Sequence, residues 1–227
     1  MTIHYHGGPF TPLSVLYELA GEHFCVSHAY PQQVARMHEI GQSVMIDNGA
    51  YSQWKSGKAT DWAAYYEWTD RWLDCPTTWA VIPDLIEGEG QEQDALIREW
   101  PHGHRGAPVW HMHEGVYRLL NLIDAGWPKV CVGSSGAYAT VLSEAWCRRM
   151  DEAWNEVART FKRLPWLHML RGMQLAGRHY PFASLDSTDV AQNHNRPHNS
   201  APAMARRWNA QQTPGRWETR PLQMELV

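Results

Sequence analysis

Short apolar runs rich in β-branched and aromatic residues alternate along this chain with stretches of helical spacing. Strands that alternate with helices indicate a parallel sheet, and eight such units predict a compact (β/α)8 TIM-type barrel. A doubly wound open sheet is the alternative. That fold usually has a glycine-rich phosphate loop after its first strand, which the GGPF segment from Gly7 matches weakly. The eight predicted strands are Ile3–Tyr5, Phe24–Ser27, Ser43–Ile46, Trp79–Ile82, Pro108–Met112, Lys129–Val132, Trp166–Leu170 and Phe182–Leu185.

The segments between these strands carry helix-start signals. Pro31 suits a first helical turn, and Thr60 is the expected N-cap of the third helix. The connection after the seventh strand, residues 171–180, is short, and the eighth helix is expected to begin near Ser187. The other predicted helices cover residues 12–20, 31–40, 60–73, 92–100, 115–125 and 137–161.

We divide the chain into a barrel of residues 1–198 and a tail of residues 199–227 that packs on the barrel or extends from it. The tail contains prolines and arginines and has only a partly helical pattern. From Val190 onward, five arginines and two glutamates give a local charge of +3. Arginines in such a segment are predicted to contact nucleic-acid phosphates. They are Arg196, Arg206, Arg207, Arg216 and Arg220.

Composition narrows the class of protein. The 227 residues are 44% hydrophobic and 19% charged, which predicts a folded chain with a sizeable core. The net charge of −4 argues against a uniformly basic nucleic-acid-binding surface. No apolar run reaches the ~18 residues of a membrane helix, and the first ten residues do not resemble a signal peptide. The four cysteines are far apart, and Cys25 and Cys131 lie in predicted strands, so we expect reduced core thiols in a cytoplasmic protein.

Three carboxylates follow three different predicted strands. Asp47 and Asn48 end the third, Asp84 follows the fourth, and Asp186 follows the eighth. The carboxyl ends of barrel strands meet at one mouth, where barrel enzymes carry their chemistry. A single aspartate after a strand often caps a turn, but three together favour a functional cluster. Paired carboxylates suit glycosidic-bond chemistry, in which one attacks the anomeric carbon or stabilises its charge and the other moves a proton.

Other polar and small residues follow the later strands. His111 and His113 follow the fifth strand, and His168 and Arg171 end the seventh. The turn VGSSG after the sixth strand includes Gly133, Ser134 and Ser135. Its backbone N–H groups could hold a phosphate or a purine edge. A tight turn without a ligand is the alternative.

A metal hydrolase is a competing hypothesis, because histidine pairs of the H-x-H type are typical zinc ligands. His4 and His6, with His111 and Asp186, superficially resemble the metal site of an amidohydrolase barrel. That pattern also needs a mid-barrel lysine or a further ligand, and no lysine lies near Asp84. A third hypothesis is a non-catalytic barrel that binds nucleic acid through the arginine tail and exposed tryptophans.

The order of these motifs resembles the queuine tRNA-ribosyltransferase (tRNA-guanine transglycosylase) superfamily, and most closely its small phage-type relatives that act on DNA. DNGAYSQ, which begins at Asp47, is similar to the family's D-S-G-G-F-Q loop. PDLIEG around Asp84 is similar to its base-reading aspartate, and GSSG to its glycine-rich turn. LDS at Leu185 to Ser187 is similar to the late segment that carries the nucleophile. The resemblance covers roughly residues 3–193.

The resemblance implies a base exchange without a metal or nucleotide cofactor. Asp186 would be the nucleophile and Asp47 the general acid and base, with Asp84 reading the guanine edge. The target base must first leave its stack. We expect it to be held between aromatic or apolar groups, for which Tyr51, Trp110 and Met169 are positional candidates. Asp189, three residues after Asp186, is the rival nucleophile.

Two departures from the family bear on the partner. The chain is shorter than the tRNA enzymes, and it has no C-x-C-x-x-C motif and no cysteine after Cys147, so the zinc-binding insertion is predicted to be absent. That insertion helps to engage tRNA, so its absence favours DNA as the nucleic acid. The second substrate would be a free 7-deazaguanine base such as 7-cyano-7-deazaguanine. The resemblance also makes a homodimer an open expectation.

Overall fold

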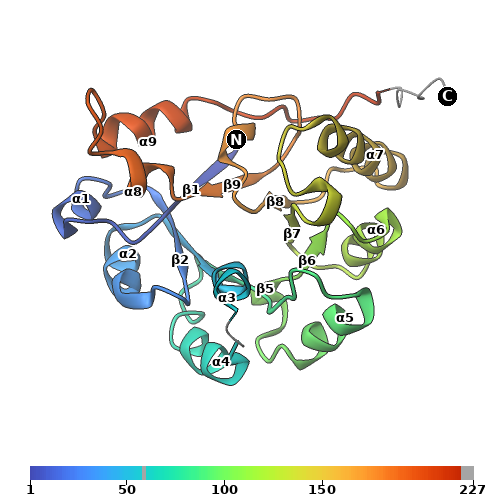
Figure 1. Ribbon diagram of the computed structural model, residues 1–227, viewed down its shortest axis with the longest axis horizontal. Helices are drawn as coiled ribbons and strands as arrows, with labels where there is room; N and C mark the ends of the chain where they lie inside the picture. The colour runs from blue at the N-terminus through green and yellow to red at the C-terminus, as the bar shows by residue number, and fades with distance from the viewer. Residues whose placement is uncertain (58–59, 221–227) are drawn as a thin grey trace.

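The computed structural model describes residues 1–57 and 60–220, and its centre is a parallel sheet that curls into a nearly closed barrel (Figure 1). The sheet order is β5-β4-β3-β2-β1-β9-β8-β7-β6, and each described strand pair is parallel. This confirms the predicted parallel α/β arrangement. The strands are β1 (Ile3–Gly7), β2 (His23–Ser27), β3 (Ser43–Asp47), β4 (Thr78–Val81), β5 (Gly106–Ala107), β6 (Val109–His111), β7 (Val130–Gly133), β8 (Leu167–Met169) and β9 (Ser184–Ser187).

The two strands at the ends of this order, β5 and β6, are separated in the chain by Pro108 alone. Ala107 accepts a hydrogen bond from Ile82 on one side, and Pro108 accepts one from Cys131 on the other. Proline has no N–H to donate to a strand ladder, so regular pairing is interrupted here. The fifth predicted strand, residues 108–112, is therefore two short strands that pair with different neighbours.

Helices surround the sheet (Figure 1). They are α1 (Leu13–Tyr17), α2 (Val34–Ile40), α3 (Ala50–Ser56), α4 (Trp62–Asp70), α5 (Gly90–Glu99), α6 (Val116–Asp124), α7 (Glu144–Thr160), α8 (Asp189–Asn193) and α9 (Ala201–Asn209). In the described part of the chain, none of them combines the length and the apolar character that a membrane span needs.

Two local predictions need correction. The N-cap of α4 is Asp61 rather than Thr60, because the Asp61 carboxylate accepts a hydrogen bond from the Ala64 N–H. The predicted helix 137–161 begins only at residue 144, where the Ser143 hydroxyl caps it. The eighth helix begins at Asp189, close to the expected start near Ser187. Helix α3 was not predicted at all. The short connection after the seventh strand is confirmed, since its regular structure is a single 3-10 turn at residues 173–175.

Alternation along the strands separates two apolar layers. The barrel interior contains Tyr5, Met45, Trp79 and the free, buried thiols of Cys25 and Cys131. The other face of the sheet packs against the helices in two larger clusters, one of which contains the fully buried Trp110, Trp146 and Trp154. Side chains near the carboxyl ends of the strands that share the Tyr5 face therefore point into the barrel mouth.

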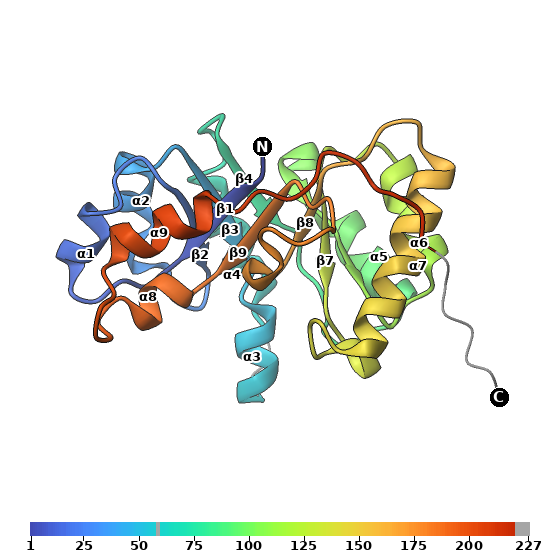
Figure 2. The ribbon, with the colours of Figure 1, turned by 90° about the horizontal axis from the view of Figure 1, so that it is seen from above.

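The C-terminal segment wraps around the barrel. Helix α9 buries Ala201, Met204 and Ala205 against the core cluster that includes α8. Beyond it, Gln212 and Thr213 hydrogen-bond to Thr2, just before β1. Figure 2 shows this segment crossing the end of the barrel opposite to the one from which α3 projects. Residues 221–227 of the predicted tail lie outside the described residues.

Candidate active site

A cavity of about 720 Å³ opens at the carboxyl ends of the strands, and the three predicted carboxylates Asp47, Asp84 and Asp186 all line it. Asp47 is the last residue of β3, and Asp186 lies within β9. Asp186 is the register partner of Tyr5, whose ring is in the barrel interior, so its carboxylate faces the same way. The three predicted carboxylates therefore lie together at the mouth of the barrel.

The turn after β3 depends on a glycine. Gly49 has a φ of 79° and its added Cβ would lie 3.1 Å from the Ala29 nitrogen, so a side chain here would be both strained and crowded. This turn lets the Asn48 side-chain oxygen Oδ1 accept a hydrogen bond from the Ala50 N–H at 2.8 Å, at the start of α3. The same turn therefore positions Asp47, Asn48 and the helix that carries Tyr51.

Asp84 is clamped by two donors. Asn48 Nδ2 donates to Asp84 Oδ1 at 2.7 Å and also to the carbonyl of Ile82 at 2.8 Å. His111 Nε2 lies 2.8 Å from Asp84 Oδ2, and because an ionised carboxylate only accepts, this nitrogen donates. Asp84 is 5% exposed, so its carboxylate keeps a fixed orientation. Each oxygen still has a second lone pair for a ligand in the cavity.

Two neighbouring residues, Arg171 and His168, hold the Asp186 carboxylate in position. Its Oδ1 accepts a hydrogen bond from the Arg171 backbone N–H at 2.6 Å and lies 3.2 Å from His168 Nε2. His168 is fully buried, and its other ring nitrogen lies 2.9 Å from the Ser184 hydroxyl. Arg171 adopts a backbone φ of 54°, a conformation that residues other than glycine rarely adopt. This strained residue presents its N–H to Asp186.

The surroundings of Asp47 favour its protonated form. Burial, together with the negative charges of Asp186 and Asp84, raises the pKa of Asp47 to about 6, against the lowering effect of hydrogen bonds from Ser27 and the Gly49 N–H. A carboxyl group with this pKa exchanges its proton near neutral pH. Asp47 can therefore donate and accept a proton within the cavity.

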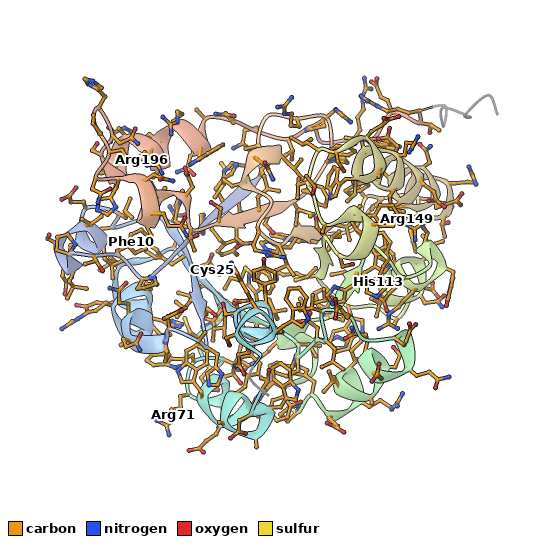
Figure 3. The ribbon with its side chains drawn as sticks, viewed as in Figure 1. Phe10, Cys25, Arg71, His113, Arg149 and Arg196 are labelled. Atoms are coloured by element: carbon orange, nitrogen blue, oxygen red, sulfur yellow. The ribbon has the colours of Figure 1, made fainter. Side chains whose placement is uncertain are left out.

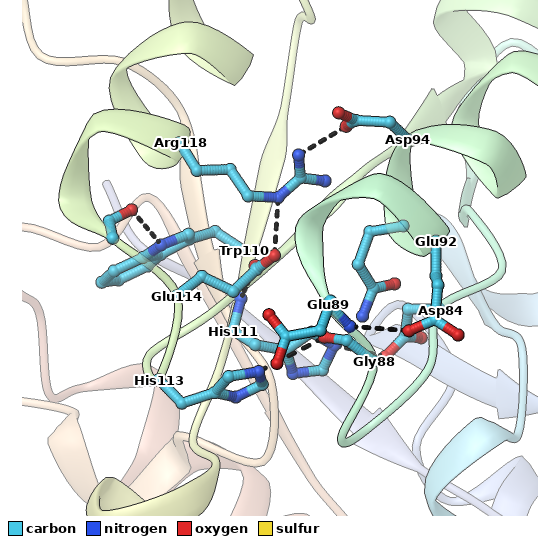
Figure 4. Close-up of polar contacts among 12 residues, drawn as sticks. Asp84, Gly88, Glu89, Glu92, Asp94, Trp110, His111, His113, Glu114 and Arg118 are labelled. Atoms are coloured by element: carbon cyan, nitrogen blue, oxygen red, sulfur yellow. Dashed lines mark hydrogen bonds and ion pairs between the residues drawn. The ribbon is translucent and has the colours of Figure 1, made fainter.

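A buried ionic chain supports the wall that carries His111 (Figure 4). Glu114 accepts a hydrogen bond from the His111 backbone N–H at 2.9 Å, and its other oxygen lies 2.8 Å from Arg118 Nε. Arg118 also pairs with Asp94. Glu114 and Arg118 are each 7% exposed. Two charges buried this far must stay paired, so the chain restrains the end of β6.

Several predicted substrate-binding residues line the cavity, and others do not. Asn48, Tyr51, His111, Gly133, Ser134 and Arg171 line it together with the three carboxylates. His113, Ser135 and His168 are not in the lining. His113 Nδ1 lies 2.7 Å from the Ser135 hydroxyl, and its ring stacks on His111. These residues support the wall instead of forming its surface.

Two of the three positional candidates for the base sandwich are wrong. Trp110 and Met169 are fully buried in the cluster between sheet and helices, because each alternates with an inward-facing neighbour on its strand. Tyr51 does line the cavity, and Leu170, one residue after Met169, lines it too. An offset of one residue along a strand reverses the face on which a side chain lies.

The metal-site hypothesis does not fit the geometry. His4 and His6 flank Tyr5 on β1, so they lie on the outer face of the sheet, opposite to Asp186. His6 lies 3.7 Å from Glu22 there, and burial lowers the pKa of His4 to about 4. Within residues 1–57 and 60–220, no three His, Cys, Asp or Glu side chains gather as metal ligands would. The proposed set of His4, His6, His111 and Asp186 is therefore not brought together.

The five tail arginines are exposed but do not form one surface. Arg196 follows α8, whose residues Gln192 and Asn193 line the cavity, and Figure 3 shows it at the periphery beside α8 and α9. Arg206 and Arg207 lie on α9. Arg216 and Arg220 line a second cavity of about 570 Å³, formed where the C-terminal segment returns along α7.

Some residues of the site carry no signal in the sequence. Ser27, Thr188 and Gln192 line the cavity from segments that the sequence marks only as strand ends or loops. Glu114 and Arg118 have an i, i+4 spacing that is common on solvated helices, so their burial was not foreseeable.

Comparison of the chain with protein-family models, with curated proteins and with solved structures found no match.

Proposed function

We propose that this protein is a transglycosylase that exchanges guanine in DNA for a free 7-deazaguanine base. The proposal counts β5 and β6 as one strand broken at Pro108, which makes the barrel a (β/α)8 barrel without a zinc insertion. The observation that carries it is the convergence of Asp47, Asp84 and Asp186 on one cavity. The cavity volume of about 720 Å³ lies within the range of ~300–1,000 Å³ that is typical of small-molecule sites.

The proposed reaction divides the work between two carboxyl groups. The Asp186 carboxylate attacks C1′ of a deoxyguanosine, an O–C1′ bond forms, and the C1′–N9 bond breaks. The electron pair of that bond leaves with guanine, which takes a proton from Asp47. A 7-deazaguanine then enters, gives its N9 proton to Asp47, and its N9 attacks C1′ to release Asp186. Every bond and proton is restored, so no cofactor is needed.

The environments of the two groups suit these roles. A general acid works best with a pKa near the working pH, and the pKa of about 6 for Asp47 meets this condition. The Arg171 N–H and His168 orient Asp186, which lies on β9. Hydrogen-bond donors aimed at a carboxylate hold it in one position, which favours attack on a bound sugar.

Asp84 is the proposed reader of the base edge. Guanine presents N1–H and an exocyclic amine, and the 7-deazaguanines present the same pair of donors. The free lone pairs of the clamped Asp84 carboxylate would accept both. Adenine lacks these donors on the corresponding edge, so its binding would leave the remaining lone pairs of this buried carboxylate without a donor. Such a loss is a strong source of selectivity.

The test follows incorporation of isotopically labelled guanine into DNA and tRNA by the purified protein. Label should enter DNA with wild-type protein and should not enter with Asp186→Asn. Asp189→Asn is the matched control, and it should retain exchange. Nucleoside mass spectrometry of DNA and tRNA from cells that express the chain and receive 7-cyano-7-deazaguanine identifies the inserted base. Binding without incorporation into either nucleic acid would instead favour the non-catalytic nucleic-acid-binding hypothesis.

A further inference from the structure

Helix α3 projects from the body of the molecule at the mouth of the barrel (Figure 2). It begins directly after Asp47 and Asn48, so its base belongs to the cavity and its far end is in solvent. Two of its aromatic side chains are exposed, Tyr51 at 37% and Trp54 at 47%. Large aromatic groups at a cavity rim indicate a binding surface when they are arranged to receive a ligand.

These two rings are ordered relative to each other and to a cation. The Arg171 guanidinium lies 3.6 Å from the centroid of the Tyr51 ring. The rings of Tyr51 and Trp54 are 5.8 Å apart with an interplanar angle of 36°. The Trp54 indole N–H donates to Glu87 at 3.3 Å, which anchors one edge of the ring. Arg171, Tyr51 and Trp54 thus form a row, which we name the mouth stack.

The mouth stack is coupled to the reacting group. The same Arg171 that lies over Tyr51 gives its backbone N–H to Asp186. A ligand that rests on the stack is therefore held in a defined position relative to the nucleophile. Aromatic faces and arginine planes are the groups on which unpaired nucleic-acid bases stack, and they do so with little sequence preference.

We propose that the mouth stack binds the unpaired nucleotide next to the one in the cavity, so that the site takes single-stranded DNA. This inference rests on the proposed function and adds the form of its substrate. In a duplex, the neighbouring base is already stacked and paired, and the projecting α3 would have to displace it. In a single strand, the neighbouring base is free to lie on Trp54.

The experiment measures binding of a fluorescent single-stranded oligodeoxynucleotide by polarisation, with the same sequence as a blunt duplex alongside. Trp54→Ala should weaken single-strand binding at least about fivefold, the lower end of what one base–aromatic stack contributes. Trp54→Phe keeps a ring and should bind within about twofold of wild type. Tyr17→Ala is the control, because Tyr17 is similarly exposed at 44% but lies at the end of α1, away from the cavity lining. It should leave binding unchanged.

Two results would overturn the proposal. One is single-strand affinity that Trp54→Ala leaves at the wild-type value. The other is a wild-type protein that binds the duplex more tightly than the single strand. Light scattering on the same samples shows whether Trp54→Ala changes the oligomeric state. A changed oligomeric state with unaltered oligonucleotide affinity would make α3 a contact between copies of the chain. That result would also overturn the proposal. Binding needs no turnover, so failure of base exchange alone would count against the proposed function and leave this inference standing.

Discussion

His111 Nε2 lies 2.8 Å from Asp84 Oδ2, and both side chains are almost fully buried. The two residues come from different strand ends, and each holds the other in one orientation. On its far side, His111 packs against Gly133, where a Cβ would lie 3.0 Å from Nδ1. The glycine of the VGSSG turn therefore makes room for the imidazole that aims Asp84.

Replacing His111 tests whether this pair reads the base. His111→Ala removes one of the two donors that orient Asp84 and should raise the KM for the free 7-deazaguanine at least about tenfold, equivalent to ~1.4 kcal/mol. The effect on kcat should be smaller, because Asp47 and Asp186 remain in place. Steady-state exchange assays give both constants. A change in kcat alone would place His111 in the chemical step instead.

Asp186→Asn and Asp189→Asn separate the nucleophile from its neighbour. Asp189 accepts hydrogen bonds from Trp208 at 3.0 Å and from Asn193 at 2.7 Å, so its carboxylate links α8 to α9. We expect Asp186→Asn to abolish the covalent adduct on a denaturing gel, in reactions without free guanine, while the melting temperature stays nearly unchanged. Asp189→Asn should form the adduct but melt a few degrees lower. Adduct formation by Asp186→Asn would refute the assignment.

Asp47→Asn should stabilise the fold above pH 6 and impair exchange. The folded protein holds the Asp47 proton up to about pH 6, whereas the ordinary pKa is 3.8. Ionised Asp47 therefore costs stability, and this cost appears as the pH rises between those values. The side chain reaches the cavity, where solvent screens its charge and reduces this cost. We therefore expect Asp47→Asn to raise the free energy of unfolding by about 1–2 kcal/mol at pH 7.5 and by almost nothing at pH 4. Denaturant unfolding at both pH values measures it; equal gains would contradict the raised pKa.

Glu114→Ala should destabilise the protein because, among the described residues, it leaves the buried Arg118 with the half-exposed Asp94 as its ionic partner. Breaking a buried pair costs about 3–5 kcal/mol, and the Asp94 contact should reduce this to ~2–3 kcal/mol. The double variant Glu114→Ala with Arg118→Met removes both charges and should recover part of the loss. Urea unfolding of the three proteins gives the comparison. No recovery in the double variant would show that the charge pair is not the cause.

The tail arginines should differ in their contribution to DNA binding. Arg196 is beside the cavity-lining α8, so Arg196→Ala should reduce the salt slope of binding by about one. Arg206→Ala with Arg207→Ala tests the exposed side of α9 in the same way. Arg216 is paired with Glu218 at 3.0 Å beside the second cavity, so Arg216→Ala should leave the slope unchanged. Affinity measured from 50 to 200 mM salt checks all three variants; equal slopes would favour a merely solvated tail.

The sequence alone determined the approximate positions of all predicted strands except the fifth, and the placement of three aspartates at strand ends. Both are local properties: a buried parallel strand needs a short apolar run, and the polar residue that follows it lies at the mouth whichever strands are neighbours. Asp47, Asp84 and Asp186 could therefore be assigned to one end of the barrel from their positions in the chain.

Only the tertiary structure decided which way side chains face and what surrounds them. His4 and His6 lie outside because Tyr5 occupies the interior, and that choice depends on packing across the whole barrel. The burial that raises the pKa of Asp47 comes from residues distant in sequence, as does the pairing of Glu114 with Arg118 inside the wall. Contacts between segments set the burial of a side chain, its charge partner and the face of the sheet on which it lies. No pattern within one segment could therefore have specified them.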